Sequence, residues 1–436
     1  MSLTLLLVVA ASPLLIAYVV ACLRDPLRWA MPPYAVLIPF SSLLSVAPGP
    51  FGSVSTLLGL LLGVALVFQL VTSRRKSAHL PAAVPVWLAF LALSGFTLFW
   101  SVAPRATADD FLILASQVLL FVAIVLTGFD ATTLRRLETA LLLGGVLIVT
   151  YGLAQVTVLG GLPGKPEGGG AARFGDELLG ANNQAAALLL PLAIAAARAL
   201  TGPRNSRLLH GAATLLILFG ILMTGSRGGL LATIVVLAAV LVLGPARVAI
   251  KLGLAAAAAV VLLVVLVANP GGFGARQLER EGSSGRTDIW AVGAHACRLY
   301  CLTGAGWGGF PVVYQQELAA VPEARIQERG TNFEPHNIFL LAAVETGVLG
   351  LVLVTLGLVL ALLSAMRLPR AMRAPPAAAV LATLLSSFFL SNLGYKFFWA
   401  VLIYVAVSET VAASRRAGTP VSALPEIPVR TGQGAA

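Results

Sequence analysis

The sequence contains little charge and few histidines or cysteines. Of its 436 residues, 11% are charged, four are histidine and three are cysteine. An ordinary soluble domain is about 25% charged, so this composition excludes that class of protein. The hydrophobic fraction of 58% and the mean hydropathy of +0.93 instead predict a polytopic membrane protein.

Several enzyme motifs are missing as well. The chain has no Asp-x-Asp, no His-Glu-x-x-His, no Cys or His cluster with zinc spacing and no P-loop. Such patterns supply metal ligands or hold nucleotide phosphates, so we expect a protein that uses no metal, no ATP and no other cofactor. The stretch GAGWGGF, residues 304–310, matches a dinucleotide pattern, but no strand precedes it and no βαβ unit surrounds it. A tight turn explains its glycines better.

The three cysteines do not predict a disulfide framework. Cys22 lies in the first apolar run, whereas Cys297 and Cys301 are one helical turn apart in a polar region. A framework would require an even set of spaced cysteines in a short secreted chain. We therefore expect Cys297 and Cys301 to be two small apolar residues on one face of a helix, although their spacing leaves pairing open.

Apolar runs alternate with short polar segments along the whole chain. A helix that crosses a bilayer needs about 20 apolar residues, and the runs predict an all-α fold with about twelve transmembrane helices in one membrane domain, residues 1–436. If the Pro-rich segment 31–48 also crosses, there are thirteen and the N-terminus lies outside; otherwise both termini are inside. The candidate spans lie near residues 2–22, 31–48, 52–72, 81–100, 110–128, 138–158, 183–200, 208–224, 228–243, 248–268, 337–364, 377–393 and 395–413.

The net charge of +11 is concentrated in alternate loops. By the positive-inside rule, basic loops face the cytoplasm, so the charge reports membrane topology and gives no reason to invoke nucleic acid. The tail 415–436 is then cytoplasmic, and segments 101–109, 159–182, 225–227 and 269–335 lie outside. The basic loops contain Arg74, Arg75, Lys76, Arg135, Arg136, Arg198, Arg204, Arg207, Arg247, Lys251, Arg367, Arg370, Arg373, Arg415 and Arg416.

The outer segment 269–335 is the one sizeable polar insertion of the sequence. It carries six arginines, no lysine and seven acids, and its length and aromatic content indicate a folded cap rather than a linker. Residues 285–300 predict a helix at the membrane surface with Trp290 at headgroup level. Four of the arginines have a glutamate one to three residues away and are expected in surface ion pairs: Arg276, Arg280, Arg325 and Arg329.

Three of the other arginines in predicted outer segments are candidates for binding a ligand, since arginines there go against the topological bias. Arg227 occupies a short turn between two apolar runs, Arg286 opens the predicted helix of the insertion, and Arg173 precedes a span. Arginine grips phosphate with a planar fork of donors, so these residues could together hold a lipid diphosphate in the outer leaflet. The alternative for Arg227 alone is that its side chain snorkels to lipid headgroups.

His336 stands at the start of a predicted span, directly after Pro335. Its ordinary pKa of about 6.5 allows a neutral imidazole to take a proton near pH 7, and backbone N–H groups of a first helical turn would disfavour its charged form. We therefore consider His336 a candidate general base. Asn337 and Glu345 are candidates for supporting residues. Glu345 lies nine positions after His336 and points to the opposite face of the helix. An equal alternative for Glu345 is that it packs against a neighbouring helix, which Gly347 and Gly350 would allow to come close.

Four stretches in order resemble one family: TGSRGGLLA (224–232), SGRTDIW (284–290), TGAGWGGF (303–310) and PHNIFLLAAVETGVLG (335–350). They resemble the O-antigen ligase and polymerase superfamily of bacterial envelopes, over residues of about 170–365. The resemblance implies a GT-C-like architecture and a metal-independent, inverting glycosyltransferase at the periplasmic face of the inner membrane. It also implies that His336 is the catalytic base and that Arg227, Arg286 and, less directly, Arg173 bind the donor diphosphate.

Three activities of that superfamily compete. A ligase would move O-antigen from undecaprenyl diphosphate to lipid A-core, in lipopolysaccharide assembly; a polymerase would join repeat units; an oligosaccharyltransferase would glycosylate protein. We favour the ligase, with undecaprenyl-diphosphate-linked O-antigen, lipid A-core and membrane lipids as partners, because the outer part is one compact insertion. A lipid-linked glycan flippase is the alternative outside enzymes, but Glu345 has no counterpart in a second, inverted half.

Overall fold

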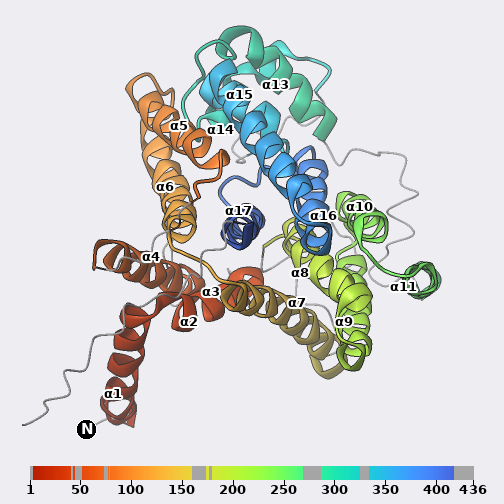
Figure 1. The fold of residues 1–436 in the computed structure, drawn as a ribbon. Helices are drawn as coiled ribbons and strands as arrows, with labels where there is room; N and C mark the ends of the chain where they lie inside the picture. The colour runs from red at the N-terminus through yellow and green to blue at the C-terminus, as the bar shows by residue number, and fades with distance from the viewer. Residues whose placement is uncertain are drawn as a thin grey trace, which may run out of the picture.

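The computed structural model describes residues 3–40, 43–44, 52–72, 77, 79–159, 173–175, 179–268, 286–324 and 333–416. The regular elements within these ranges are helices (Figure 1). Three predictions concern residues outside them: the ion pairs of the four arginines near glutamates, the first part of the outer insertion, and the tail beyond residue 416.

The helices follow the apolar runs of the sequence. The N-terminal half contains α1 (Leu3–Arg24), α2 (Pro26–Trp29), α3 (Met31–Leu37), the 3-10 helix η1 (Ile38–Phe40), α4 (Val54–Thr72), α5 (Ala83–Phe96), η2 (Thr97–Phe99), α6 (Pro104–Leu126) and α7 (Ala131–Leu159). The remaining elements are α8 (Ala181–Thr201), α9 (Arg204–Met223), α10 (Arg227–Leu243), α11 (Val248–Ala268), α13 (Arg286–Tyr300), α14 (Phe310–Glu317), η5 (Leu318–Ala320), α15 (Ile338–Arg367), α16 (Arg370–Ser387) and α17 (Lys396–Arg416).

Among the described residues, seven helices are long and apolar enough to cross a membrane, namely α4, α6, α7, α8, α9, α15 and α17. Shorter apolar helices include the described parts of α1, α5, α10 and α11. The described part of the chain is therefore helical, and its apolar helices indicate a multi-pass membrane protein, as the composition predicts.

The described part of the Pro-rich segment 31–48 contains only short helices. These are α3, seven residues long, and the three-residue η1. At about 1.5 Å per residue, such a helix is roughly 10 Å long, whereas the hydrocarbon core is about 30 Å thick. Prolines at positions 32, 33 and 39 accompany these short helices. The described residues thus favour twelve spans, and the choice between twelve and thirteen stays a prediction.

Two helices form the interior of the bundle. For α8 and α17, 83% of the apolar window is buried inside the protein, whereas the other five spans reach at most 44%. Figure 1 shows α17 near the centre, with the other helices around it. Trp87 of α5 packs edge-on against Phe398 and Trp399 of α17, with ring centroids 5.9 and 5.1 Å apart. Aromatic packing therefore ties the N-terminal helices to the last one.

The long helix α15 is broken near its outer end. Gly347 has φ +73°, a left-handed conformation that glycine adopts without a steric penalty. The backbone groups freed by the break bond to the loop that follows α13: Val348 N donates to Cys301 O over 2.7 Å, and Ala305 N donates to Val344 O over 2.8 Å. A loop, rather than the predicted neighbouring helix, therefore lies against Gly347.

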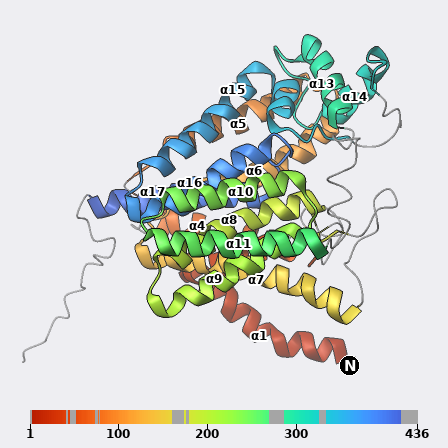
Figure 2. The ribbon, with the colours of Figure 1, turned by 90° about the vertical axis from the view of Figure 1, so that its right-hand side faces the viewer.

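The described part of the outer insertion is folded, and α13 and α14 gather at one end of the bundle, beside the start of α15 (Figure 2). Helix α13 spans residues 286–300, as predicted, and buries Ile289, Val292 and Ala296. Trp290 was predicted to lie at headgroup level. Its indole N–H donates a hydrogen bond to Pro335 O, within the protein, over 2.7 Å.

A disulfide joins Cys297 to Cys301 at the end of α13. The interpretation of these residues as two small apolar side chains is therefore wrong. Hydropathy and helical spacing could not distinguish the two cases, because the pair lies one turn apart on one face in either case. Cys22 is buried and free.

Candidate active site

His336 lies just before α15 rather than in its first turn. Asn337 is the N-cap of the helix, and its side-chain oxygen accepts hydrogen bonds from the backbone N–H groups of Phe339 and Leu340, each over 3.0 Å. This cap satisfies two of the N–H groups that a helix start leaves free. Asn337 thus fixes where α15 begins and how the backbone of His336 enters the helix.

The backbone of His336 has an uncommon conformation. Its φ is +46°, and among the described residues it is the one non-glycine residue with positive φ. This region costs roughly 1–2 kcal/mol for a residue with a side chain. The neighbours on both sides hold it: Trp290 binds the carbonyl of Pro335, and Asn337 caps the helix. Such outliers concentrate at functional sites.

A cavity of about 250 Å³ contains His336. Its wall comes from three parts of the chain: the start of α8, the loop before α15 and the loop between α16 and α17. The other lining residues are Asn183, Phe333, Glu334, Ser391 and Tyr395. The cavity is therefore polar on several sides and assembled from positions more than 200 residues apart in sequence.

The three outer arginines come from three different elements. Arg227 is the first residue of α10, which Ser226 caps by accepting from Gly229 N over 3.1 Å. Arg286 is the first residue of α13. Arg173 donates through Nε to Thr224 O over 2.8 Å and through Nη2 to Asn182 Oδ1 over 3.4 Å. The carbonyl of Thr224 thereby fixes Arg173 beside the turn that carries Arg227.

The charges of these three arginines act on one another. Burial lowers the pKa of Arg286, and the charges of Arg173 and Arg227 lower it further. Like charges shift one another's pKa mainly when they lie within about a Debye length of each other. Among the described residues, no carboxylate forms an ion pair with Arg227 or Arg286. The group is thus a concentrated positive field, suited to an anion of more than one charge.

This positive field reaches His336. Burial lowers the pKa of His336 to about 4, and the charge of Arg286 contributes to that shift. The imidazole is therefore neutral at pH 7 and can accept a proton. An anion bound to the arginines would offset their charge and raise the proton affinity of His336.

Glu334, which the sequence interpretation counted only among the acids of the insertion, lines the same cavity. Burial raises its pKa to about 7, and the charge of Asp110 contributes in the same direction. Tyr395, also in the cavity wall, has its pKa raised to about 12 by burial and by Glu334. Because Glu334 lies two residues before His336, the sequence could have predicted that the two are close. The burial of Glu334 depends on the distant loop at 391–395.

Glu345 does not line this cavity. It is buried, with 2% of its surface exposed, and its Oε1 accepts a hydrogen bond from Phe310 N, the first N–H of α14, over 3.0 Å. The turn before α14 contains Gly304, Gly306 and Gly308, all with positive φ. The predicted tight turn is therefore present, and Glu345 holds it rather than packing against another transmembrane helix.

The described residues contain no group of three or more His, Cys, Asp or Glu side chains placed to hold a metal ion.

The order of elements and the site residues can be compared with known families. Residues 212–355 match the model of the O-antigen ligase family. Over these residues the chain is similar to that family. The matched region contains Arg227, Arg286 and His336, whereas Arg173 lies upstream of it. The resemblance to the O-antigen ligase and polymerase superfamily is thereby confirmed. No curated protein matches the chain.

Proposed function

We propose that this O-antigen ligase-family protein transfers O-antigen from undecaprenyl diphosphate to a sugar hydroxyl of lipid A-core, at the periplasmic face of the bacterial inner membrane. The convergence of His336 with Arg173, Arg227 and Arg286 carries the proposal. A neutral base beside three guanidinium groups suits a reaction that removes a proton from one substrate and releases a diphosphate from the other.

In the proposed reaction, His336 takes the proton of the acceptor hydroxyl as its oxygen attacks the anomeric carbon. The new C–O bond forms as the bond from that carbon to the diphosphate oxygen breaks, on the opposite face, so the configuration inverts. Undecaprenyl diphosphate leaves with the electron pair. Arg227 and Arg286, with Arg173, offset the charge that develops on the leaving oxygen, so this step requires no metal.

The disulfide of Cys297 and Cys301 supports the assignment of α13 to the outer side. Disulfides persist in oxidising compartments such as the bacterial periplasm. The basic loops at the other ends of the helices support the same orientation.

The test uses the purified chain in liposomes with an undecaprenyl-diphosphate O-antigen donor, with and without lipid A-core. We expect glycan to appear on lipid A-core, by gel and by mass, without added metal. His336→Ala should lose this product by at least a hundredfold while still binding the donor. Unchanged activity in His336→Ala would remove the base assignment.

The same reaction separates the competing activities. Longer glycan that stays on undecaprenyl diphosphate, whether or not lipid A-core is present, would identify a polymerase. Glycan on an added pilin-type acceptor protein would identify an oligosaccharyltransferase. Movement of the intact donor between leaflets, with no bond broken, would identify a flippase.

A further inference from the structure

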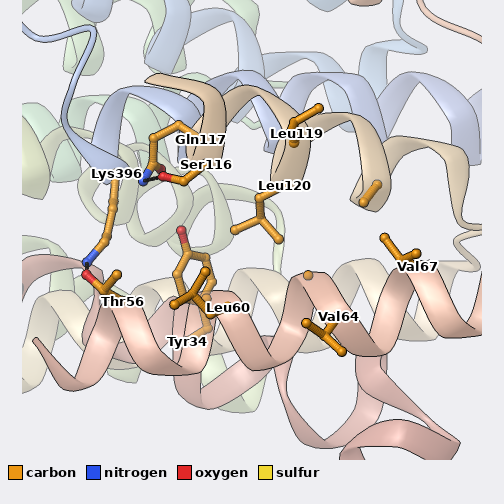
Figure 3. A pocket seen from close by; sticks show the side chains of 13 residues that line it. Tyr34, Thr56, Leu60, Val64, Val67, Ser116, Gln117, Leu119, Leu120 and Lys396 are labelled. Carbon is orange, nitrogen blue, oxygen red and sulfur yellow. Dashed lines mark hydrogen bonds between the residues drawn. The ribbon is translucent and has the colours of Figure 1, made fainter. Parts of the chain in front are cut away.

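A groove distinct from the candidate active site lies between α4 and α6. Its volume is about 370 Å³. Figure 3 shows its two contrasting ends: Lys396, Thr56, Ser116 and Gln117 gather at one, and Val64, Val67 and Leu119 line the remainder. The groove therefore has the amphipathic form of a lipid, with a polar head end and a long apolar body.

The apolar body of the groove opens sideways. Both α4 and α6, which form the groove, are candidate membrane spans. Four of their apolar side chains in the groove are 45–62% exposed: Leu60, Val64, Val67 and Leu119. Gly63 leaves space in the groove wall, because a Cβ placed there would find its nearest neighbour, Leu120 Cδ1, at 3.9 Å. A hydrocarbon chain could thus enter from the bilayer.

The polar end of the groove carries one positive charge. The Lys396 ammonium donates to Ser55 Oγ over 2.6 Å, to Thr56 Oγ1 over 2.7 Å and to Ser53 Oγ over 3.3 Å. Within the described chain, these partners are hydroxyls and no carboxylate pairs with Lys396. An ammonium at low dielectric without an anion favours the approach of one.

A second feature at this end is a buried acceptor without a hydrogen-bond donor. Gln117 is 7% exposed, and its Oε1 has no hydrogen-bond partner among the described residues. Buried amide oxygens are ordinarily satisfied. A ligand with both an anionic phosphate and hydroxyl groups would complement Lys396 and Gln117 together.

We propose that this groove binds an anionic glycerophospholipid of the phosphatidylglycerol class, with one acyl chain along α4 and α6 and its phosphate at Lys396. The single charge of Lys396 matches a phosphodiester, which carries one negative charge, whereas the three outer arginines suit a diphosphate. The glycerol hydroxyls supply the donors that Gln117 lacks. Lys396 directly follows Tyr395 of the His336 cavity, so the lipid headgroup would lie behind the candidate active site.

The test is native mass spectrometry of the full chain, released from detergent and titrated with phosphatidylglycerol or with phosphatidylcholine of matched acyl chains. For the first lipid bound, we expect phosphatidylglycerol to be preferred about fivefold, the order of effect of one basic residue toward anionic lipid. Lys396→Gln should remove the preference, and Lys396→Arg should keep it. Gly63→Leu should weaken both lipids by filling the groove.

Two further measurements locate the site. Phosphatidylglycerol with a photoactivatable group in its acyl chain should label peptides of α4 and α6, and Gly63→Leu should lose this label. Val71→Leu, at an 80% exposed position of α4 outside the groove, is the matched control and should behave as wild type.

Three results would overturn the proposal: equal binding of the two lipids, a preference that survives in Lys396→Gln, or displacement of the lipid by undecaprenyl phosphate, which would assign the groove to the donor tail. If Lys396→Gln does not fold, the lipid preference of Lys396→Arg and the lipid affinity of Gly63→Leu still test the proposal. No glycan donor or acceptor is present, so the outcome is independent of the proposed reaction.

Discussion

At the residue scale, the candidate base and the acid beside it have pKa values displaced in opposite directions. Burial and Arg286 lower the pKa of His336 to about 4, and burial and Asp110 raise the pKa of Glu334 to about 7. A base acts only when it is unprotonated, so kcat/KM falls as pH drops through the pKa that the base has in the free enzyme. The two residues therefore predict different pH profiles.

With His336 as the base, we expect kcat/KM to remain level from pH 8 down to about 5 and to fall near pH 4. Arg286→Gln should move this fall to higher pH, because it removes one cause of the low pKa of His336. A profile that falls near pH 7, and that Glu334→Gln alters, would identify Glu334 as the base. The measurement is the initial rate of transfer at subsaturating donor over this pH range.

Arg227 provides a test of diphosphate binding. A hydrogen bond to a charged group contributes about 1.5–3 kcal/mol, so Arg227→Gln should raise the Kd for undecaprenyl diphosphate by about 10–100-fold. Arg204→Gln is the matched control, since Arg204 is also the first residue of its helix, is exposed, and lies on the predicted cytoplasmic side. Equal Kd values for the two variants would contradict the binding role. Calorimetry in detergent gives both constants.

At the element scale, the break in α15 and the loop after α13 depend on each other. A Cβ at position 347 would lie 2.6 Å from Leu302 O, and the positive φ of Gly347 adds backbone strain. Gly347→Ala should therefore lower the melting temperature, by several degrees. Gly253→Ala in α11 is the control, because nothing lies within 4 Å of a Cβ there, and it should leave the melting temperature unchanged or raise it slightly. A variant at 347 as stable as wild type would argue against the close approach of the loop.

Glu345 links the same elements through its side chain. Glu345→Leu leaves the buried N–H of Phe310 without its acceptor, and an unsatisfied buried donor costs about 1–3 kcal/mol. We expect α14 and its turn to become more sensitive to limited proteolysis in this variant. Glu345→Gln keeps an oxygen acceptor and should resist proteolysis nearly as well as wild type. Identical digestion of wild type and Glu345→Leu would show that the contact does not stabilise the turn.

At the scale of the whole molecule, the distribution of basic residues predicts which helix ends face the cytoplasm. Asn205 lies at the start of α9 on the predicted inner side, and Ala320 follows α14 on the predicted outer side; both are exposed. In intact spheroplasts, a membrane-impermeant maleimide should label Ala320→Cys at once and Asn205→Cys only after the membrane is opened. The reverse pattern would invert the proposed orientation of the site.

The helices were largely predictable because apolar runs of sufficient length have few alternatives in a bilayer. The choice between twelve and thirteen spans stayed open at segment 31–48, since hydropathy does not register how closely spaced prolines limit a helix. The break at Gly347 was missed because it depends on which loop lies against α15. The disulfide of Cys297 and Cys301 was missed because the two residues share one helix face whether or not they are bonded.

The site was partly predictable. His336 and the outer arginines were found because charged or titratable side chains next to apolar runs are rare and expensive. Glu334, Asn183 and Tyr395 were missed as cavity residues because the α8 start and the loop before α17 meet His336 only in three dimensions.

The concentration of positive charge at the three outer arginines has a consequence for turnover. A glycan-bearing diphosphate carries two negative charges, whereas the released undecaprenyl diphosphate has a terminal phosphate that ionises further near neutral pH. In the proposed reaction, the site would therefore hold its product more tightly than its donor, and released carrier would inhibit the enzyme. Sustained synthesis would then depend on another activity that keeps the membrane concentration of the spent carrier low.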